Sequence, residues 1–226
     1  MAVAEVQAPA GGIWRVARGG DPFARPPRLP RTNLTKGNRF DPLTLEYDVL
    51  YFGTDLETCF GETLARFRPN LDLVSLVEKE WDEFGFMALG TVAADWRHRR
   101  TAGHLLLPDD CLFLDVEAPE THQVLRKQLA LGLSALGCKD LDVSTVRGPD
   151  RRVTQLISEW TYAQERYAGI RYFSRLHTGW ECWAVFYRTI ERLLAAGDLE
   201  VVETVPITED MPALLAVAEL FELRVF

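Results

Sequence analysis

The chain has 226 residues, of which 47% are hydrophobic and 26% are charged, and its net charge is −8 at pH 7. This balance is that of an ordinary globular protein and excludes a chain that is disordered overall. Nucleic-acid binders need a basic surface to neutralise phosphates, so the acidic balance argues against direct nucleic-acid binding. A small anionic ligand needs only a local group of arginines and stays possible.

The first quarter of the chain predicts two strands joined by a long loop. Residues 1–12 are expected to form a flexible leader, with the domain proper spanning 13–226. Residues 13–17 alternate apolar and polar side chains, which is typical of a strand. The stretch 18–47 is rich in proline and arginine, and loops of this length inside a compact domain usually have a function. Residues 49–52 predict the second strand.

A helix is predicted to follow, with Thr54 as its N-cap, Glu57 completing a capping box, and Phe67 near its end. Helical spacing assigns Leu56, Phe60, Thr63, Leu64 and Phe67 to an apolar stripe, and Asp55, Cys59, Glu62 and Arg66 to the opposite side. Glu62 is therefore not a core residue. It either forms a surface ion pair with Arg66, four residues later, or serves as a functional carboxylate.

The rest of the chain mixes helices and strands. Helices are predicted at 72–83, 119–136, 149–166 and 211–221, and strands at 86–95, 111–116, 170–174, 182–187, 199–206 and 223–226. The last strand-helix-strand set falls within 190–226. Strands and helices interspersed in one compact chain predict a single α+β domain, with central mixed sheets and surrounding helices.

The cysteines and histidines show no metal-binding pattern. The four cysteines and four histidines are far apart and form neither a C-x-x-C pair nor an H-E-x-x-H motif, which predicts no metal site. The start of the chain lacks the layout of a signal peptide. No apolar run approaches the ~18 residues needed to cross a bilayer. We expect a cytoplasmic protein with reduced thiols and no membrane association.

Three residues outside the helix of Glu62 are further candidates. Tyr51 closes the strand before that helix, Arg39 leaves the glycine-containing loop before the strand, and Ser174 ends a later predicted strand. Each also has a plain structural explanation: a half-buried ring, a solvated loop charge and a strand end. The sequence has no Gly-x-Ser-x-Gly elbow and no glycine-rich dinucleotide fingerprint after a strand.

The order and spacing of several short segments between residues 13 and 188 resemble the RES domain family. These segments are Ile13-Trp14-Arg15-Val16, Gly37-Asn38-Arg39-Phe40-Asp41-Pro42, Leu50-Tyr51-Phe52-Gly53-Thr54, Cys59-Phe60-Gly61-Glu62-Thr63-Leu64 and Gly169-Ile170-Arg171-Tyr172-Phe173-Ser174-Arg175. The chain departs from the family in two places: Phe40 stands where many members have Trp, and Val16 stands where some have Tyr. Residues 190–226 extend beyond compact members, so their role stays open.

The resemblance implies a fold similar to ADP-ribosyltransferase toxins and cleavage of NAD⁺ by the toxin of a toxin–antitoxin pair. It implies that the family's two arginines are Arg15 and Arg39, its tyrosine Tyr51, its glutamate Glu62 and its serine Ser174. NAD⁺ would be the substrate, with no further cofactor. The expected partner is an antitoxin with a helix-turn-helix (Xre-like) part that covers the cleft. A homodimer is a further possibility, through the apolar segment 213–221.

The chemistry of NAD⁺ cleavage fits these residue types. Breaking the nicotinamide–ribose bond builds positive charge on the ribose, as in glycoside hydrolysis, and Glu62 would stabilise that charge. Arg15 and Arg39 would bind the diphosphate through guanidinium forks. Tyr51 would stack on nicotinamide or ribose with its hydroxyl satisfied. Ser174 would donate a hydrogen bond to the carboxamide or the phosphate.

The sequence does not fix what attacks the ribose. Water would make the protein a glycohydrolase, phosphate would make it a phosphorylase, and a protein or small acceptor would make it an ADP-ribosyltransferase. A different class of function is a non-enzymatic interaction module, in which the arginines and Glu62 merely pair on the surface.

Overall fold

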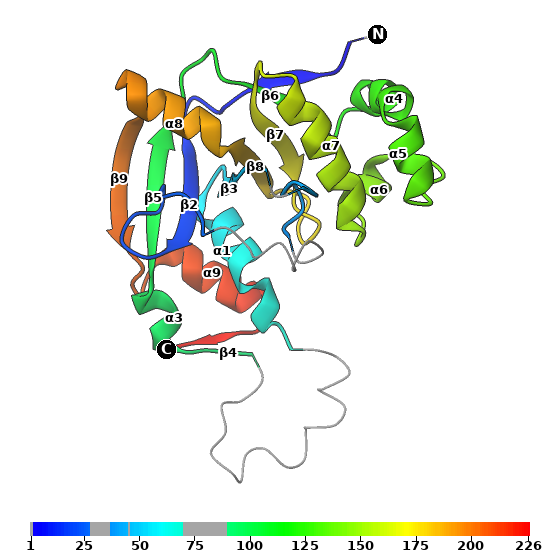
Figure 1. Cartoon of the computed structure of the whole chain (residues 1–226). Helices are drawn as coiled ribbons and strands as arrows, with labels where there is room; N and C mark the ends of the chain where they lie inside the picture. Colours follow the sequence, from blue (N-terminus) through cyan, green and yellow to red (C-terminus); the bar gives the residue numbers. More distant parts are fainter. Residues whose placement is uncertain (1, 28–36, 45, 70–89) are drawn as a thin grey trace.

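The computed structural model describes residues 2–27, 37–44, 46–69 and 90–226 (Figure 1). The strands in this part of the chain are β1 (Glu5–Gln7), β2 (Ile13–Arg18), β3 (Val49–Gly53), β4 (Thr91–Val92), β5 (Arg100–Leu106), β6 (Leu112–Asp115), β7 (Tyr167–Phe173), β8 (Glu181–Phe186), β9 (Glu200–Pro206) and β10 (Arg224–Val225). The helices are α1 (Leu56–Leu64), the 3₁₀ turn η2 (Ala65–Phe67), α3 (Ala94–His98), α4 (Pro119–Gln128), α5 (Ala130–Ala135), α6 (Val143–Arg147), α7 (Arg151–Ala163), α8 (Tyr187–Ala196) and α9 (Pro212–Leu220).

The main sheet is mixed. Within the described residues its strands follow the order β1-β6-β7-β8-β3-β2-β5-β9, and β10 pairs separately with β4. β6 and β7 run parallel, whereas the other neighbours in the main sheet are antiparallel. Helices α4 to α7 gather beside the β6–β7 part of the sheet (Figure 1). The α+β fold class predicted from the sequence is therefore confirmed.

Both faces of the sheet centre are covered, which explains why β3 and β8 are continuous apolar runs. Successive side chains of a strand point to opposite faces. Val49 of β3 packs in a core cluster with Ile157 of α7. Leu50, one residue later, packs in a second cluster with Ile190 of α8. Because α7 and α8 cover opposite faces, neither face of β3 needs polar residues.

The C-terminal segment, whose role the sequence left open, is part of the same structure. β9 pairs with β5 at one edge of the sheet, and α9 lies against α1. Phe60 of α1 and Val217 of α9 belong to a third core cluster, which also holds Trp180. Helix α1 is thus held between the sheet and α9.

Several predicted elements have different bounds in the structure. The helix predicted over 119–136 is broken at Leu129, where φ is −109°, into α4 and α5. In its described part, the strand predicted over 86–95 is present only as the two-residue strand β4, because helix α3 begins at Ala94. β5 is a strand that the sequence analysis did not predict. The helix predicted over 72–83 lies outside the described residues.

The expected flexible leader also differs from the structure. Residues Glu5–Gln7 form β1, which pairs with β6 as the edge strand of the main sheet. The strands predicted at 13–17, 49–52 and 199–206 are confirmed as β2, β3 and β9. No helix in the described ranges is long and apolar enough to span a membrane.

Candidate active site

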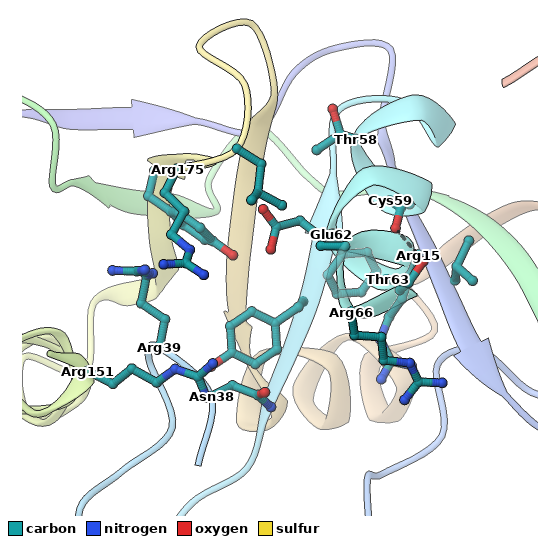
Figure 2. A pocket seen from close by; sticks show the side chains of 16 residues that line it. Arg15, Asn38, Arg39, Thr58, Cys59, Glu62, Thr63, Arg66, Arg151 and Arg175 are labelled. Atoms are coloured by element: carbon teal, nitrogen blue, oxygen red, sulfur yellow. Dashed lines mark hydrogen bonds between the residues drawn. The ribbon is translucent and has the colours of Figure 1, made fainter. Parts of the chain in front are cut away.

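A cavity of about 460 Å³ lies beside α1 and collects side chains from distant parts of the chain. Its lining includes Arg15 of β2, Arg39, Tyr51 of β3, Glu62 of α1, Arg151 of α7 and Arg175, which follows β7 (Figure 2). The structure therefore brings together four of the residues singled out in the sequence. The fifth, Ser174, hydrogen-bonds to Glu62.

Helix α1, which contains Glu62, starts directly after β3. Its N-cap is Asp55, whose Oδ1 accepts a hydrogen bond from the Thr58 backbone N–H at 2.7 Å. The predicted capping role of Thr54 is wrong. The Thr54 hydroxyl donates to Glu181 Oε2 at 2.8 Å and accepts from Trp183 Nε1 at 3.0 Å, so contacts with β8 replace the cap.

The two faces of α1 differ in part from the helical-wheel prediction. Phe60 and Leu64 are fully buried, as predicted, and Glu62 is exposed to the cavity. Cys59, expected on the polar side, is buried and donates its S–H to the Trp14 carbonyl oxygen at 3.1 Å. No ion pair joins Glu62 to Arg66, although both residues are described; the Arg66 guanidinium lies 4.7 Å from the centre of the Phe67 ring instead.

Gly61 determines how closely α1 packs against Trp180. A Cβ atom at this position would lie 2.1 Å from the ring of Trp180, far inside van der Waals contact. Trp180 is 5% exposed and packs in the cluster shared by α1 and α9. Only glycine lets the ring come this close, so Gly61 sets the position of its neighbour Glu62.

We expect Gly61→Ala to lower the free energy of unfolding by about 1–3 kcal/mol, because the added methyl group overpacks the Trp180 contact. The higher helix propensity of alanine, worth about 1 kcal/mol, offsets part of this loss. Urea denaturation measures the change. Gly20→Ala is the matched control, since a Cβ there meets nothing within 4 Å. Equal stability of Gly61→Ala and the wild type would contradict the packing described for Trp180.

Ser174 holds the carboxylate of Glu62. The residue is 2% exposed; its Oγ donates to Glu62 Oε1 at 2.5 Å and accepts from the Leu176 backbone N–H at 3.0 Å. A serine hydroxyl has one proton to donate. In this arrangement that proton is used on Glu62, and the donation to a carboxamide or phosphate expected from the sequence stays a prediction. Ser174 is a positioning residue for the carboxylate.

The hydroxyl of Tyr51 is fully satisfied within the protein. It donates to Asp41 Oδ1 at 2.8 Å and accepts from the Phe40 backbone N–H at 2.9 Å. Burial raises the pKa of Tyr51 well above its ordinary value of 10.0, so the phenol stays neutral. The ring can offer the cavity a face for stacking, whereas its hydroxyl fixes the loop before β3.

Arg39 is anchored to the C-terminal end of α6. Its Nη1 donates to the carbonyl oxygens of Val146 at 2.5 Å and Gly148 at 3.1 Å, at the C-terminal end of α6. Burial lowers the pKa of Arg39, and the positive charges of Arg175 and Arg151 lower it further, against the opposite effect of the negatively charged Glu62. Arg39 therefore interacts electrostatically with Arg175, Arg151 and Glu62.

Arg15 makes a hydrogen bond to a backbone carbonyl group in the segment that follows β2. Its Nη1 donates to the Pro22 carbonyl oxygen, and burial lowers the pKa of Arg15 to about 10. The side chains that act on its charge are Cys59 and Asp21, not Glu62. Arg15 lines the same cavity as Arg39, and its expected binding of a diphosphate together with Arg39 stays a prediction.

The cavity contains more positive charge than the sequence analysis assigned to it. Arg66, Arg151 and Arg175 line it together with the two predicted arginines, against the single carboxylate of Glu62 among the described lining residues. From the sequence, Arg171 and Arg175, which flank Ser174, could each supplement the phosphate-binding arginines but lie outside the predicted primary site. Arg171 instead pairs with Asp115 at 3.2 Å and Glu181 at 2.7 Å. In a chain of net charge −8, this local excess favours an anionic ligand.

Comparison with known proteins places the chain in a defined group. Its sequence matches the model of a family described as "RES domain" over residues 13–207; the match begins where the sequence analysis expected and extends beyond residue 188. A comparison with curated proteins finds no match. Among solved structures, the fold is similar to a chain in the crystal structure of the M. tuberculosis MbcT–MbcA toxin–antitoxin complex. The TM-score is 0.53 at 13% identity, over 96% of this chain and 90% of that chain.

Proposed function

The chain belongs to the RES domain family, and we propose that it cleaves the nicotinamide–ribose bond of NAD⁺ as the toxin of a toxin–antitoxin pair. The observation that supports this most is the carboxylate of Glu62. It faces an arginine-lined cavity of about 460 Å³ and is held in place by the buried Ser174. A fixed carboxylate beside a group of cations suits a substrate that combines a reactive ribose with a diphosphate.

The reaction breaks the bond between the ribose C1′ and the nicotinamide nitrogen. The bonding electron pair leaves with nicotinamide, which becomes neutral, so no strong general acid is needed. Positive charge develops on the ribose, as in glycoside hydrolysis. Glu62 stabilises that charge, and because Ser174 already orients it, little reorganisation is needed when the charge appears. Guanidinium groups hold the diphosphate in bidentate fashion.

Three acceptors are compatible with this cavity. Water yields ADP-ribose, inorganic phosphate yields a phosphorylated ADP-ribose, and a nucleophile on a protein or small molecule receives the ADP-ribosyl group. One site serves all three reactions, because the bond that breaks is the same. One experiment distinguishes the three acceptors by their products.

An antitoxin partner is part of the proposal. The fold's similarity to a chain of a toxin–antitoxin complex supports a partner of this kind. We propose that the partner has an Xre-like helix-turn-helix part, that it covers the cavity, and that the cytoplasmic pool of NAD⁺ is the substrate. A homodimer through the α9 region is compatible with the exposed Leu215 and Leu220.

We expect the purified chain to release nicotinamide from NAD⁺, and mass spectrometry of the second product identifies the acceptor. A product of ADP-ribose mass in phosphate-free buffer indicates hydrolysis. A heavier product that appears only with phosphate indicates phosphorolysis. Label from NAD⁺ on protein indicates transfer. NAD⁺ that remains intact in all three conditions would leave the interaction module as the function.

A further inference from the structure

The arginines that line the cavity have no carboxylate partners. Among the described residues, no ion pair involves Arg15, Arg39, Arg66, Arg151 or Arg175. Arg147, a partly buried arginine outside the cavity lining, does pair with a carboxylate, Glu117, at 2.8 Å. Among the described lining residues, five arginines that face the single carboxylate of Glu62 leave an excess of positive charge in this cavity, and an anionic ligand would reduce their mutual repulsion.

Three of these arginines form a group on one side of Glu62. Arg39, Arg151, Arg175 and Glu62 line the same cavity. The charges of Arg175 and Arg151 lower the pKa of Arg39 and the charge of Glu62 raises it, as expected for charged groups that lie near one another. In Figure 2 the Glu62 carboxylate is turned toward Arg39 and Arg175, whereas Arg15 and Arg66 lie on the other side of Glu62. We call Arg39, Arg151 and Arg175 the three-arginine cluster.

Each member of the three-arginine cluster keeps donors for a ligand. Both side-chain hydrogen bonds of Arg39 use Nη1 alone. Arg151 gives one hydrogen bond, from Nη1 to the Gly37 carbonyl oxygen at 2.8 Å. Arg175 is exposed and, within the described residues, makes no hydrogen bond and no ion pair. A guanidinium has five N–H donors, so most of the donors of the cluster remain unused.

We propose that the three-arginine cluster binds the diphosphate of the dinucleotide, which makes Arg151 and Arg175 substrate-binding residues. This inference rests on the proposed function. Three guanidinium groups offer planar, bidentate donors to the diphosphate oxygens. Their position on the side to which Glu62 turns lets the diphosphate bind while the adjacent ribose lies at the carboxylate. Arg15, on the other side of Glu62, also lines the cavity and uses Nη1 on the Pro22 carbonyl oxygen.

The test compares Arg175→Gln and Arg151→Gln with Arg152→Gln. Arg152 is the matched control, because it neighbours Arg151 on α7 but is exposed, pairs with Asp150 and does not line the cavity. In steady-state NAD⁺ consumption we expect KM to rise about tenfold in each cavity variant, equivalent to ~1.4 kcal/mol of binding. We expect kcat to stay within about twofold, and Arg152→Gln to match the wild type.

A binding measurement separates this inference from the proposed function. By calorimetry, ADP-ribose should bind the wild type about tenfold more tightly than Arg175→Gln, whereas adenosine, which has no diphosphate, should bind both equally. If the wild type consumes no NAD⁺, the proposed function fails and the ADP-ribose comparison still tests the cluster. Unchanged ADP-ribose affinity in both cavity variants, or a fall in kcat at constant KM, would overturn the assignment of the diphosphate to this cluster.

Discussion

Glu62→Gln is expected to reduce NAD⁺ cleavage by about 10²- to 10³-fold or more while leaving the free energy of unfolding within about 0.5 kcal/mol of the wild type. Glutamine has the size of glutamate and still offers an oxygen to the Ser174 hydroxyl, but it removes the negative charge that the developing ribose cation needs. Glu62 is exposed to the cavity and does not pack in the core, so the fold does not depend on it. Nicotinamide release and urea denaturation measure the two effects.

Glu57→Gln is the matched control, because Glu57 is an exposed carboxylate on the same helix and outside the cavity lining. It should keep full activity. In bacteria, induction of the wild type should lower cellular NAD⁺ before growth stops, whereas Glu62→Gln should be harmless at equal expression. An active Glu62→Gln enzyme would mean that another group stabilises the ribose. Growth arrest at unchanged NAD⁺ would favour ADP-ribosyl transfer to an essential target.

Arg39→Lys should lower kcat/KM about a hundredfold although the charge is kept. The arginine uses Nη1 on the carbonyl oxygens of Val146 and Gly148 and still has donors for a ligand. A lysine ammonium is a point charge on a flexible stem and cannot serve the carbonyl groups and a diphosphate in the same planar geometry. Steady-state kinetics, with the melting temperature measured in parallel, checks this expectation.

The control for Arg39→Lys is Arg152→Lys, which changes an exposed arginine outside the cavity. This variant should retain wild-type kinetics. A near-normal kcat/KM in Arg39→Lys would show that Arg39 only caps α6. A loss of activity fully accounted for by unfolding at the assay temperature would give the same answer.

Local patterns predicted the helix around Glu62 well, because helical spacing depends only on residues a few positions apart. They could not predict its cap. Thr54 and Asp55 are both good N-cap residues. Asp55 takes the role because the Thr54 hydroxyl is bound to Glu181 and Trp183, 127 and 129 residues away. Contacts with β8, a strand far away in the sequence, therefore determine which of the two residues caps the helix.

The missed strand β5 shows the same limit. It follows a run of basic residues and begins at Arg100, so the segment looks like a solvated surface. Pairing decides its structure: β5 lies between β2 and β9, and its His104 stacks on Trp14 of β2 with ring centres 4.3 Å apart. No window of the sequence contains that contact.

The candidate site divides in the same way. Arg39, Tyr51 and Glu62 lie close in sequence around one strand, so the sequence alone could predict that they belong to one site. Arg151 and Arg175 belong to α7 and to the end of β7, and only the fold brings them to the same cavity. The contact of Ser174 with Glu62 was not visible in the sequence for a related reason: the two residues are 112 positions apart.

That separation also has a consequence for synthesis. A ribosome adds about 5–20 residues per second, so the 112 residues between Glu62 and Ser174 take roughly 6 to 22 seconds to translate. During that interval the nascent chain has its carboxylate but neither the serine that orients it nor strand β8, which pairs with β3. The cavity lining is complete only once Arg175 and Leu176 have been added, so a product truncated before residue 174 lacks both of them as well as the serine that orients Glu62.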